Sequence, residues 1–388
     1  MKWIDYLSNQ LNIQKKRKLW RKRKIIQNNN IRTLLIDNKK YLNFSTNDYL
    51  GLTSNQSIIE AWKTGLDKFG TGSGSSSYIT GYSSAHAKLE TKLANWLNYD
   101  KALLFNSGYS ANQSVINVLM NHKNNLIIAD KLFHASLLEA GINSKAKLKR
   151  FNHNEILSLE KKILESNSKK ILVATEGIFS MNGDIAPLNQ IQIITKKYNT
   201  FLLVDDAHGI GIQGKEGSGS CKLYNIKPEL LIVTFGKAFG ISGAALLCNK
   251  TIANYFLQNA KHLIYSTSIP PAQAMALIEA INQIRHADKL RMNLKKNISF
   301  FIKKAHEYNL PILNSYTPIQ PLMVGKNDVC LKIAEFLKKN KIWVQAIRPP
   351  TVPPGTSRLR ITLNACHKLN DILKLIKTIS YFFKKINE

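Results

Sequence analysis

The sequence predicts an α/β fold, with a mainly parallel seven-stranded sheet that has helices on both faces and a smaller C-terminal α/β domain. Seven short apolar runs alternate with segments whose apolar residues recur at helical spacing. That alternation is typical of parallel sheets buried on both sides. The 388 residues also exceed the roughly 250–300 at which one core stops growing, so a second domain is expected.

The chain begins with a predicted amphipathic helix, because Trp3, Leu7 and Leu11 recur every four residues. We expect this helix to dock on the body of the protein rather than to lie on a membrane surface. A short strand pair completes the N-terminal segment of residues 1–44, and the large domain is expected to span residues 45–286. The strands are predicted at residues 33–36 and 41–44 for the pair, and at 102–105, 126–129, 148–151, 171–175, 201–204, 230–235 and 244–248 for the sheet.

The last segment, residues 287–388, has the pattern of a smaller α/β domain. Its prolines at positions 349, 350, 353 and 354 exclude helix and remove backbone donors, so residues 348–354 are expected to form an irregular loop. The other elements are predicted as helices at 294–308 and 328–339 and as extended segments near 319–324, 343–347 and 358–363.

Lys237 and Asp205 each follow a short apolar run, which places them at carboxyl ends of parallel strands, where α/β folds bind ligands. A lysine amine can bind an aldehyde as a Schiff base, and a carboxylate can keep a pyridine nitrogen protonated. Either residue alone is ordinary, because most lysines after strands are solvated and most Asp-Asp pairs lie in turns. Together they indicate pyridoxal 5'-phosphate.

Two histidines strengthen this interpretation. His208 comes three residues after Asp205, so it can meet the phenolic oxygen of the cofactor while the carboxylate meets the ring nitrogen. His134 follows another apolar run, and its imidazole can stack on the ring face opposite the lysine. The alternative for His134 is a histidine at a helix start whose hydrogen bond is satisfied within the protein.

A phosphate site is predicted at Ser107, Gly108 and Tyr109, where an apolar run ends, turn residues follow and helical spacing begins. Free backbone N–H groups at a helix start attract anions. Further along, Arg360 lies on a predicted strand, and an arginine fork suits a carboxylate. An interdomain salt bridge is an equally good interpretation of Arg360.

Longer runs resemble the α-oxoamine synthases, a family of fold-type I pyridoxal-phosphate-dependent transferases. The matching runs are residues 43–51, 134–139, 175–181, 204–209, 234–237, 264–267 and 348–353, followed by 358–360. The resemblance implies the fold-type I architecture. It also implies that Lys237 binds the cofactor's aldehyde, that Asp205 and His208 contact its ring, and that His134 stacks on that ring.

Other roles follow from the same resemblance. Ser180 and Thr234 match positions that contact the cofactor, and Gly108 and Tyr109 match the backbone beside its phosphate. Asn47 and Arg360 match positions that bind the amino-acid carboxylate, and Arg21 and Thr351 match positions assigned to the acyl substrate. Ser266 and Thr267 resemble a segment that reaches the partner subunit's phosphate site, which implies a homodimer.

The reaction implied is a decarboxylative condensation of L-alanine with a pimeloyl thioester, carried by coenzyme A or by acyl carrier protein, in biotin biosynthesis. The runs 175–180, 233–236 and 346–350 favour that branch of the family. Glycine-using members, such as glycine C-acetyltransferase, and serine palmitoyltransferase share the same chemistry and stay open as alternatives.

The net charge of +30 is the feature that could indicate a nucleic-acid-binding protein instead. Eight of the ten residues from Lys15 to Lys24 are basic. Lysines are nevertheless spread over the whole chain, and no zinc-finger or RNA-recognition pattern accompanies them, so no nucleic-acid partner is expected. A basic surface can instead attract the phosphates of coenzyme A or an acidic carrier protein.

The remaining composition indicates a cytoplasmic enzyme with no membrane segment. The four cysteines are scattered without a C-x-x-C pair, so neither a disulfide framework nor a metal site is expected. No apolar stretch reaches the roughly 18–20 residues that a membrane helix needs, and no signal peptide is visible at the N-terminus.

Overall fold

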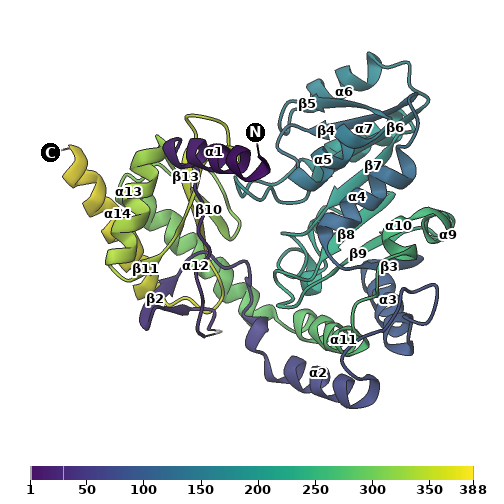
Figure 1. The fold of residues 1–388 in the computed structure, drawn as a ribbon, viewed down its shortest axis with the longest axis horizontal. Coiled ribbons are helices and arrows are strands. Elements are labelled where there is room, and N and C mark those ends of the chain that lie inside the picture. Colours follow the sequence, from purple (N-terminus) through teal and green to yellow (C-terminus); the bar gives the residue numbers. More distant parts are fainter. Residues whose placement is uncertain (1, 29, 388) are drawn as a thin grey trace. The chain divides into compact units, whose positions relative to one another are not determined.

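The structure is a computed structural model that describes residues 2–28 and 30–387. Within this part, the chain forms two compact units (Figure 1). Unit 1 comprises residues 1–47, 181–183 and 292–388, and unit 2 comprises residues 48–180 and 184–291. The first 47 residues therefore group with the C-terminal segment. The three-part division at residues 45 and 287 stays a prediction. No helix in the described ranges is both long enough and apolar enough to cross a membrane.

Unit 2 is built on the seven-stranded sheet, and all seven strands predicted from the sequence are confirmed. The strands are β3 (Lys101–Phe105), β4 (Asn125–Asp130), β5 (Lys147–Phe151), β6 (Lys170–Glu176), β7 (Phe201–Asp205), β8 (Leu230–Thr234) and β9 (Ala244–Cys248). Their order is β3-β9-β8-β7-β6-β4-β5. Four of the pairings are parallel, and β9 is antiparallel to both of its neighbours.

Since β9 alone runs in the opposite direction, the other six strands end on the same side of the sheet. We call this side the carboxyl edge. It is defined by the last residues of those strands: Phe105, Asp130, Phe151, Glu176, Asp205 and Thr234. Ligands of open α/β sheets bind at such edges.

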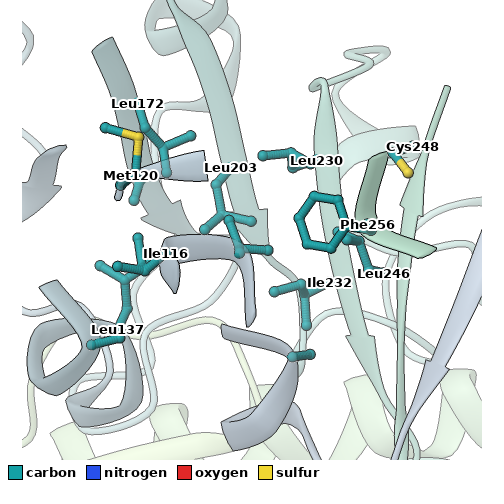
Figure 2. Packing of buried hydrophobic residues seen from close by; sticks show 14 of the residues in the cluster. Ile116, Met120, Leu137, Leu172, Leu203, Leu230, Ile232, Leu246, Cys248 and Phe256 are labelled. Carbon is teal, nitrogen blue, oxygen red and sulfur yellow. The ribbon is translucent and has the colours of Figure 1, made fainter. Parts of the chain in front are cut away.

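Helices cover both faces of this sheet. On one face, residues of α4 (Gly108–Leu119), α5 (Ala135–Asn143) and α9 (Lys250–Asn259) pack on alternate strand residues, as Figure 2 shows for Ile116, Leu137 and Phe256 around Leu203 and Ile232. The intervening strand residues, such as Val173 and Leu202, are buried as well, so the opposite face is also covered. The other helices of unit 2 are α2 (Gln56–Phe69), α3 (Ser84–Leu97), α6 (Ile156–Leu164), α7 (Leu188–Lys197), α8 (Ser220–Leu223), α10 (Lys261–Ile264) and α11 (Pro271–Arg285).

Unit 1 contains two three-stranded sheets. In the first, β1 (Thr33–Ile36) pairs with β2 (Lys39–Asn43), which pairs in turn with β11 (Ile342–Trp343). In the second, β13 (Ser357–Thr362) lies between β10 (Ile319–Gly325) and β12 (Gln345–Ile347). Its helices are α1 (Trp3–Lys16), α13 (Asn327–Lys339), α14 (Leu369–Asn387) and the part of α12 (Asp288–Glu307) from Met292 onward. Residues 348–354 form an irregular loop, as predicted.

The N-terminal helix is present, and its expected docking on the body stays a prediction. None of the residues of α1 is buried, and Trp3 is 78% exposed. Three apolar residues four positions apart make a narrow stripe along the helix. The periodicity therefore predicted the helix correctly without specifying a partner for its apolar side.

Candidate active site

The ionisable residues predicted to carry the chemistry gather at the carboxyl edge of unit 2. Asp205 is the last residue of β7, and its register partner on β6 is Glu176, so two carboxylates lie side by side at adjacent strand ends. Lys237 follows three residues after Thr234, the last residue of β8, in a loop where its side chain is half-buried. The charge of Lys237 acts on Glu176 and on Asp206. The lysine and the carboxylates therefore share one electrostatic environment.

Asp205 is held by a buried amide. Asn112 of α4 donates from Nδ2 to Asp205 Oδ2 at 2.7 Å and to Ser136 Oγ at 3.1 Å. The backbone N–H of Ala207 donates to Asp205 Oδ1 at 3.0 Å. Because Asn112 is 1% exposed, it cannot exchange these partners for water, and the carboxylate orientation is fixed from α4 as well as from β7.

The same network determines the protonation of His134. Ser136 Oγ accepts from Asn112 and lies 2.8 Å from His134 Nδ1, which also accepts from the backbone N–H of Ser136 at 3.3 Å. A hydroxyl that accepts from Asn112 has its own proton left to donate to Nδ1, so the proton of the neutral imidazole lies on Nε2. His134 is also the N-cap residue of α5, which is the alternative considered from the sequence.

Electrostatics support the neutral form of His134. Part of the His134 residue is exposed to solvent. Desolvation by the surrounding protein nevertheless lowers the pKa of its imidazole. The negative charge of Asp205 raises this pKa, and the positive charge of Lys237 lowers it further. The imidazole is therefore uncharged at neutral pH and presents an N–H donor at Nε2.

Two further carboxyl groups adjoin Asp205: Glu176 on the neighbouring strand and Asp206 next in the chain. Burial raises the pKa of Glu176 well above its ordinary value, and the charge of Asp205 adds to this effect. Burial also raises the pKa of Asp206 to about 7, although hydrogen bonds from Ser220 act against it. Glu176 accepts a hydrogen bond at Oε2 from the backbone N–H of Ser180 at 3.3 Å, which connects the predicted cofactor contact at Ser180 to β6.

His208 lies in the turn after β7 and is almost completely buried. Its Nδ1 is 2.6 Å from the hydroxyl of Tyr49, a residue that has no exposed surface. The position of the His208 ring is therefore set by an aromatic side chain that is distant in the sequence but in contact in the fold.

The predicted phosphate site is the junction between β3 and α4. Ser107 caps α4, and its Oγ accepts from the backbone N–H of Ser110 at 3.1 Å. A Cβ atom on Gly108 would lie 2.5 Å from Cγ2 of Thr234, so only glycine fits there. Thr234 Oγ1 is buried and has no hydrogen-bond partner within the described structure. The Tyr109 ring meets His134 edge-on at 6.3 Å, and its hydroxyl contacts Glu139.

The four substrate-binding residues predicted for the C- and N-terminal segments all belong to unit 1 and occur there as two pairs. Arg360 of β13 donates from Nη1 to Asn47 Oδ1 at 3.0 Å and to Thr362 Oγ1 at 3.1 Å. On the exposed surface, Arg21 Nη2 donates to Thr351 Oγ1 at 3.4 Å. Each pair unites two residues that the sequence assigned to the same substrate group.

Ser266 and Thr267 belong to the segment that follows α10. They line a cavity of about 430 Å³ in unit 2, together with Tyr82, Glu90 and Asn106. The lining of this cavity includes neither Lys237 nor Asp205. Thr267 is fixed there because its backbone oxygen accepts from Asn106 Nδ2 at 3.2 Å.

Residues 39–379 match the sequence model of the family described as aminotransferase class I and II. The chain belongs to this family. Two relatives named 8-amino-7-oxononanoate synthase, from Buchnera aphidicola subsp. Baizongia pistaciae (strain Bp) and Yersinia pseudotuberculosis serotype O:1b (strain IP 31758), are each 50% identical to this chain over 98% of its length and cover 98% and 99% of their own.

Solved structures of two named enzymes show the same fold. A serine palmitoyltransferase variant from S. paucimobilis, with a bound PLP–myriocin aldimine, has a TM-score of 0.94 at 23% identity over 100% of both chains. An 8-amino-7-oxononanoate synthase from Francisella tularensis has a TM-score of 0.79 at 29% identity, over 90% of this chain and 99% of that chain.

The residues at the carboxyl edge fit the pyridine cofactor expected for a class I and II aminotransferase. The space beside Gly108 has no room for a side chain. Next to it lies the Thr234 hydroxyl, which has no hydrogen-bond partner among the described residues. The N–H groups of Gly108 and Tyr109 precede the first hydrogen bond of α4, made by Ala111 to Ser107. These donors suit a phosphate. Within the described ranges, no group of three His, Cys, Asp or Glu side chains is arranged to hold a metal ion.

Four residues that support the site at the carboxyl edge were not predicted from the sequence. Asn112, Glu176, Asp206 and Tyr49 contact or electrostatically influence the predicted residues. A signal existed for Glu176, which ends a buried strand, and for Asn112, a polar residue on the apolar side of a predicted helix. Tyr49 and Asp206 gave no comparable signal, because aromatic residues and Asp-Asp pairs are common outside sites.

Proposed function

We propose that the protein catalyses the decarboxylative condensation of L-alanine with a pimeloyl thioester, carried by coenzyme A or acyl carrier protein, to give 8-amino-7-oxononanoate in biotin biosynthesis. The observation that carries this proposal is the 50% identity to synthases of that name over nearly the full chain. It is supported by the lysine, carboxylate and imidazole network at the carboxyl edge.

We propose pyridoxal 5'-phosphate as the cofactor. Bound there, it supplies a protonated ring that accepts electrons from the Cα of the amino acid. Lys237 holds its aldehyde, Asp205 its ring nitrogen and His208 its phenolic oxygen. His134 covers one face of the ring, and the remaining contacts come from Ser107, Gly108, Tyr109, Ser180 and Thr234, with Ser266 and Thr267 acting from the partner subunit.

Each residue of the site has its own role in the reaction. Nζ of Lys237, once neutral, removes the α-proton of the amino acid and later returns a proton to the same carbon. Burial raises the pKa of Glu176, which favours its protonated form and so limits the negative charge beside Asp205. The Asn112 amide keeps Asp205 oriented throughout.

The thioester carbonyl gains negative charge when the new carbon–carbon bond forms. We assign His134 Nε2–H as the donor to that oxygen, because Nδ1 is occupied as an acceptor from Ser136. Arg360 and Asn47 bind the carboxylate that departs as carbon dioxide, and Arg21 and Thr351 bind the acyl substrate. The guanidinium of Arg360 suits this task because it forms paired, charge-assisted hydrogen bonds.

The substrates are tested with one panel of purified enzyme. Alanine, glycine and serine are each combined with pimeloyl, acetyl, succinyl and palmitoyl thioesters, and the products are identified by mass spectrometry. Alanine with pimeloyl thioester is expected to exceed every other pair in kcat/KM by at least about tenfold, the scale of one lost favourable contact. A preference for glycine and a short thioester would show that the protein has the activity of another branch of the α-oxoamine synthases.

We propose that the enzyme is a cytoplasmic homodimer. Beside the cavity at Ser266 and Thr267, Ile79 and Tyr265 are 75% and 76% exposed, and Ser76 pairs with Thr267, so the apolar residues lie on adjoining segments. Such a patch is typical of a protein interface. Cys221, Cys248 and Cys330 are free thiols, which suits a reducing compartment. Light scattering should give twice the 43.8 kDa chain mass, and Tyr265→Lys should lower it.

A further inference from the structure

A cluster of ionisable groups in unit 2, at the end of β4 and in the loops after β5 and β6, has no part in the roles assigned above. His153, in the loop after β5, lies between two carboxylates of unit 2. Its Nδ1 is 2.8 Å from Asp130 Oδ1, and its Nε2 is 2.5 Å from Asp184 Oδ2. The edge of the ring also meets Phe179, with ring centroids 4.5 Å apart at 88°.

This geometry requires the charged form of His153. Both ring nitrogens face carboxylate oxygens, which only accept, so each nitrogen must carry a proton. Burial lowers the pKa of His153, but the hydrogen bonds and charges of Asp130 and Asp184 outweigh burial and raise it to about 9. The imidazolium is a bridge between two anions that would otherwise repel each other.

Asp130 and Asp184 each shape a loop that carries a predicted site residue, Asp130 through its carboxylate and Asp184 through its backbone. Asp130 ends β4, and its Oδ1 accepts from the backbone N–H of Leu132 at 2.7 Å, which fixes the turn leading to His134. The backbone oxygen of Asp184 accepts from the N–H of Phe179 at 2.9 Å, which closes the loop that holds Ser180.

The neighbouring residue reinforces the bridge from the same loop. Asn154 donates from its backbone N–H to Asp130 Oδ2 at 2.9 Å and from Nδ2 to Asp184 Oδ2 at 2.9 Å. Asp184 Oδ1 is buried and has no hydrogen-bond partner among the described residues. Asp184 therefore depends on His153 for its only cationic contact in this cluster, and loss of the imidazolium leaves a poorly compensated carboxylate.

We propose that His153 is a positioning residue for the active site: held between Asp130 and Asp184, it ties the turn before His134 to the loop of Ser180 and so fixes the donor atom of His134. This rests on the proposed function for the identity of the reaction. It adds a residue that touches neither substrate nor cofactor and acts through His134.

The first test compares His153→Gln with His122→Gln, a substitution at an exposed histidine in the same unit. Amide hydrogen exchange is measured on the protein without cofactor. We expect faster exchange in residues 130–134 and 177–186 of His153→Gln and no change in β7, while His122→Gln matches the wild type. Unchanged exchange in both loops would overturn the proposal.

The second test is a double-mutant cycle on kcat, normalised to bound cofactor. His153→Gln is expected to lower kcat about tenfold, since small misplacement of a reacting group costs up to about 10²-fold. In a His134→Asn background, where asparagine still caps α5, the same change should cost less than about twofold, because coupled residues are not additive. Equal losses in both backgrounds would show that His153 does not act through His134.

Asp184→Asn is run in parallel and keeps the test decisive if His153→Gln does not fold. It preserves the side-chain shape and removes one charge, so it should show the same dependence on His134. The kinetics use whichever amino acid and thioester the wild type condenses, and the exchange experiment needs no substrate. If the wild type does not condense alanine with pimeloyl thioester, the proposed function is wrong, and the role of His153 is still decided by the exchange experiment.

Discussion

The carboxyl edge of unit 2 and the N-terminal segment of residues 3–26 differ in how far their ionisable side chains are exposed to solvent. At the edge, Glu176, Asp205 and Asp206 are nearly inaccessible to solvent, and each has a specific donor. In the N-terminal segment, all eight basic residues between Lys15 and Lys24 are exposed. The same chain thus contains ionisable groups enclosed by protein and charged groups exposed to water.

The contrast shows why the net charge of +30 was a poor guide to function. Exposed charges interact through water and salt, which weaken each pair to about 1 kcal/mol or less. Buried charges alter the protonation of their neighbours, as the pKa of Glu176 and His134 shows. Chemistry is therefore expected from the few buried groups, and substitutions in the two regions should differ in effect by orders of magnitude.

The largest effect is expected at Lys237. Lys237→Ala should remove the visible absorbance of the purified protein and lower kcat by at least about 10³-fold, since a lost general base typically costs about 10²–10⁴-fold. Absorption spectra and product formation measure both consequences. Lys222→Ala, at an exposed lysine of the same unit, is the control. An active Lys237→Ala enzyme would show that the carboxyl edge is not the catalytic site.

Asp205→Asn should retain the cofactor but lower kcat by about 10²-fold, the scale of one lost electrostatic partner in a site. The new amide would also face the Nδ2 of Asn112, which now donates to Asp205. Exchange of the substrate's α-proton with deuterium, followed by NMR, isolates this step. An exchange rate equal to that of the wild type would contradict the role of the carboxylate.

Gly108→Ala tests the packing at the predicted phosphate site. Its Cβ would lie 2.5 Å from Thr234 Cγ2, and overpacking of about 1–3 kcal/mol should weaken cofactor binding by about tenfold or more. Thr234→Ser removes that methyl group and keeps the hydroxyl, so the double variant should recover most of the affinity. Fluorescence titration with the cofactor measures it, with Thr234→Ser alone as control. No recovery would show that the contact is not the cause.

The imidazolium of His153 should make stability depend on pH in one direction. Its pKa is higher in the folded protein, about 9, than in an unfolded chain, about 6.5. The stabilisation is therefore complete below about pH 6.5 and lost as pH rises through about 9. Allowing for partial exposure, His153→Gln should cost about 1–2 kcal/mol at pH 6 and much less at pH 10. Thermal unfolding at both values measures this, and a gap that widens with pH would refute it.

The smallest effect is expected in the N-terminal segment. Lys22→Gln combined with Lys24→Gln removes two exposed charges and should change kcat, with a coenzyme A thioester, by less than about twofold, because surface charges are screened at physiological salt. Steady-state kinetics at low and physiological salt measure it. A loss comparable to that of Gly108→Ala would mean that this segment belongs to the working site after all.

Local sequence patterns predicted much of the fold and several members of the site. The apolar runs located all seven sheet strands, and the residues after three of them marked Asp205, Lys237 and His134. These features depend on neighbours in the chain, because burial on both faces and strand direction are visible in a few consecutive residues. The resemblance supplied the roles of Arg360, Asn47, Arg21 and Thr351, which no local pattern could have paired.

The sequence by itself determined where strands and helices form and which chemistry stands at the strand ends. Only the tertiary structure decided that Glu176 lies beside Asp205, that Asn112 holds that carboxylate, and that His153 bridges Asp130 and Asp184. The physical reason is range. Periodicity reports each residue's burial, whereas a hydrogen bond between side chains many residues apart depends on strand order and register, which the whole fold sets.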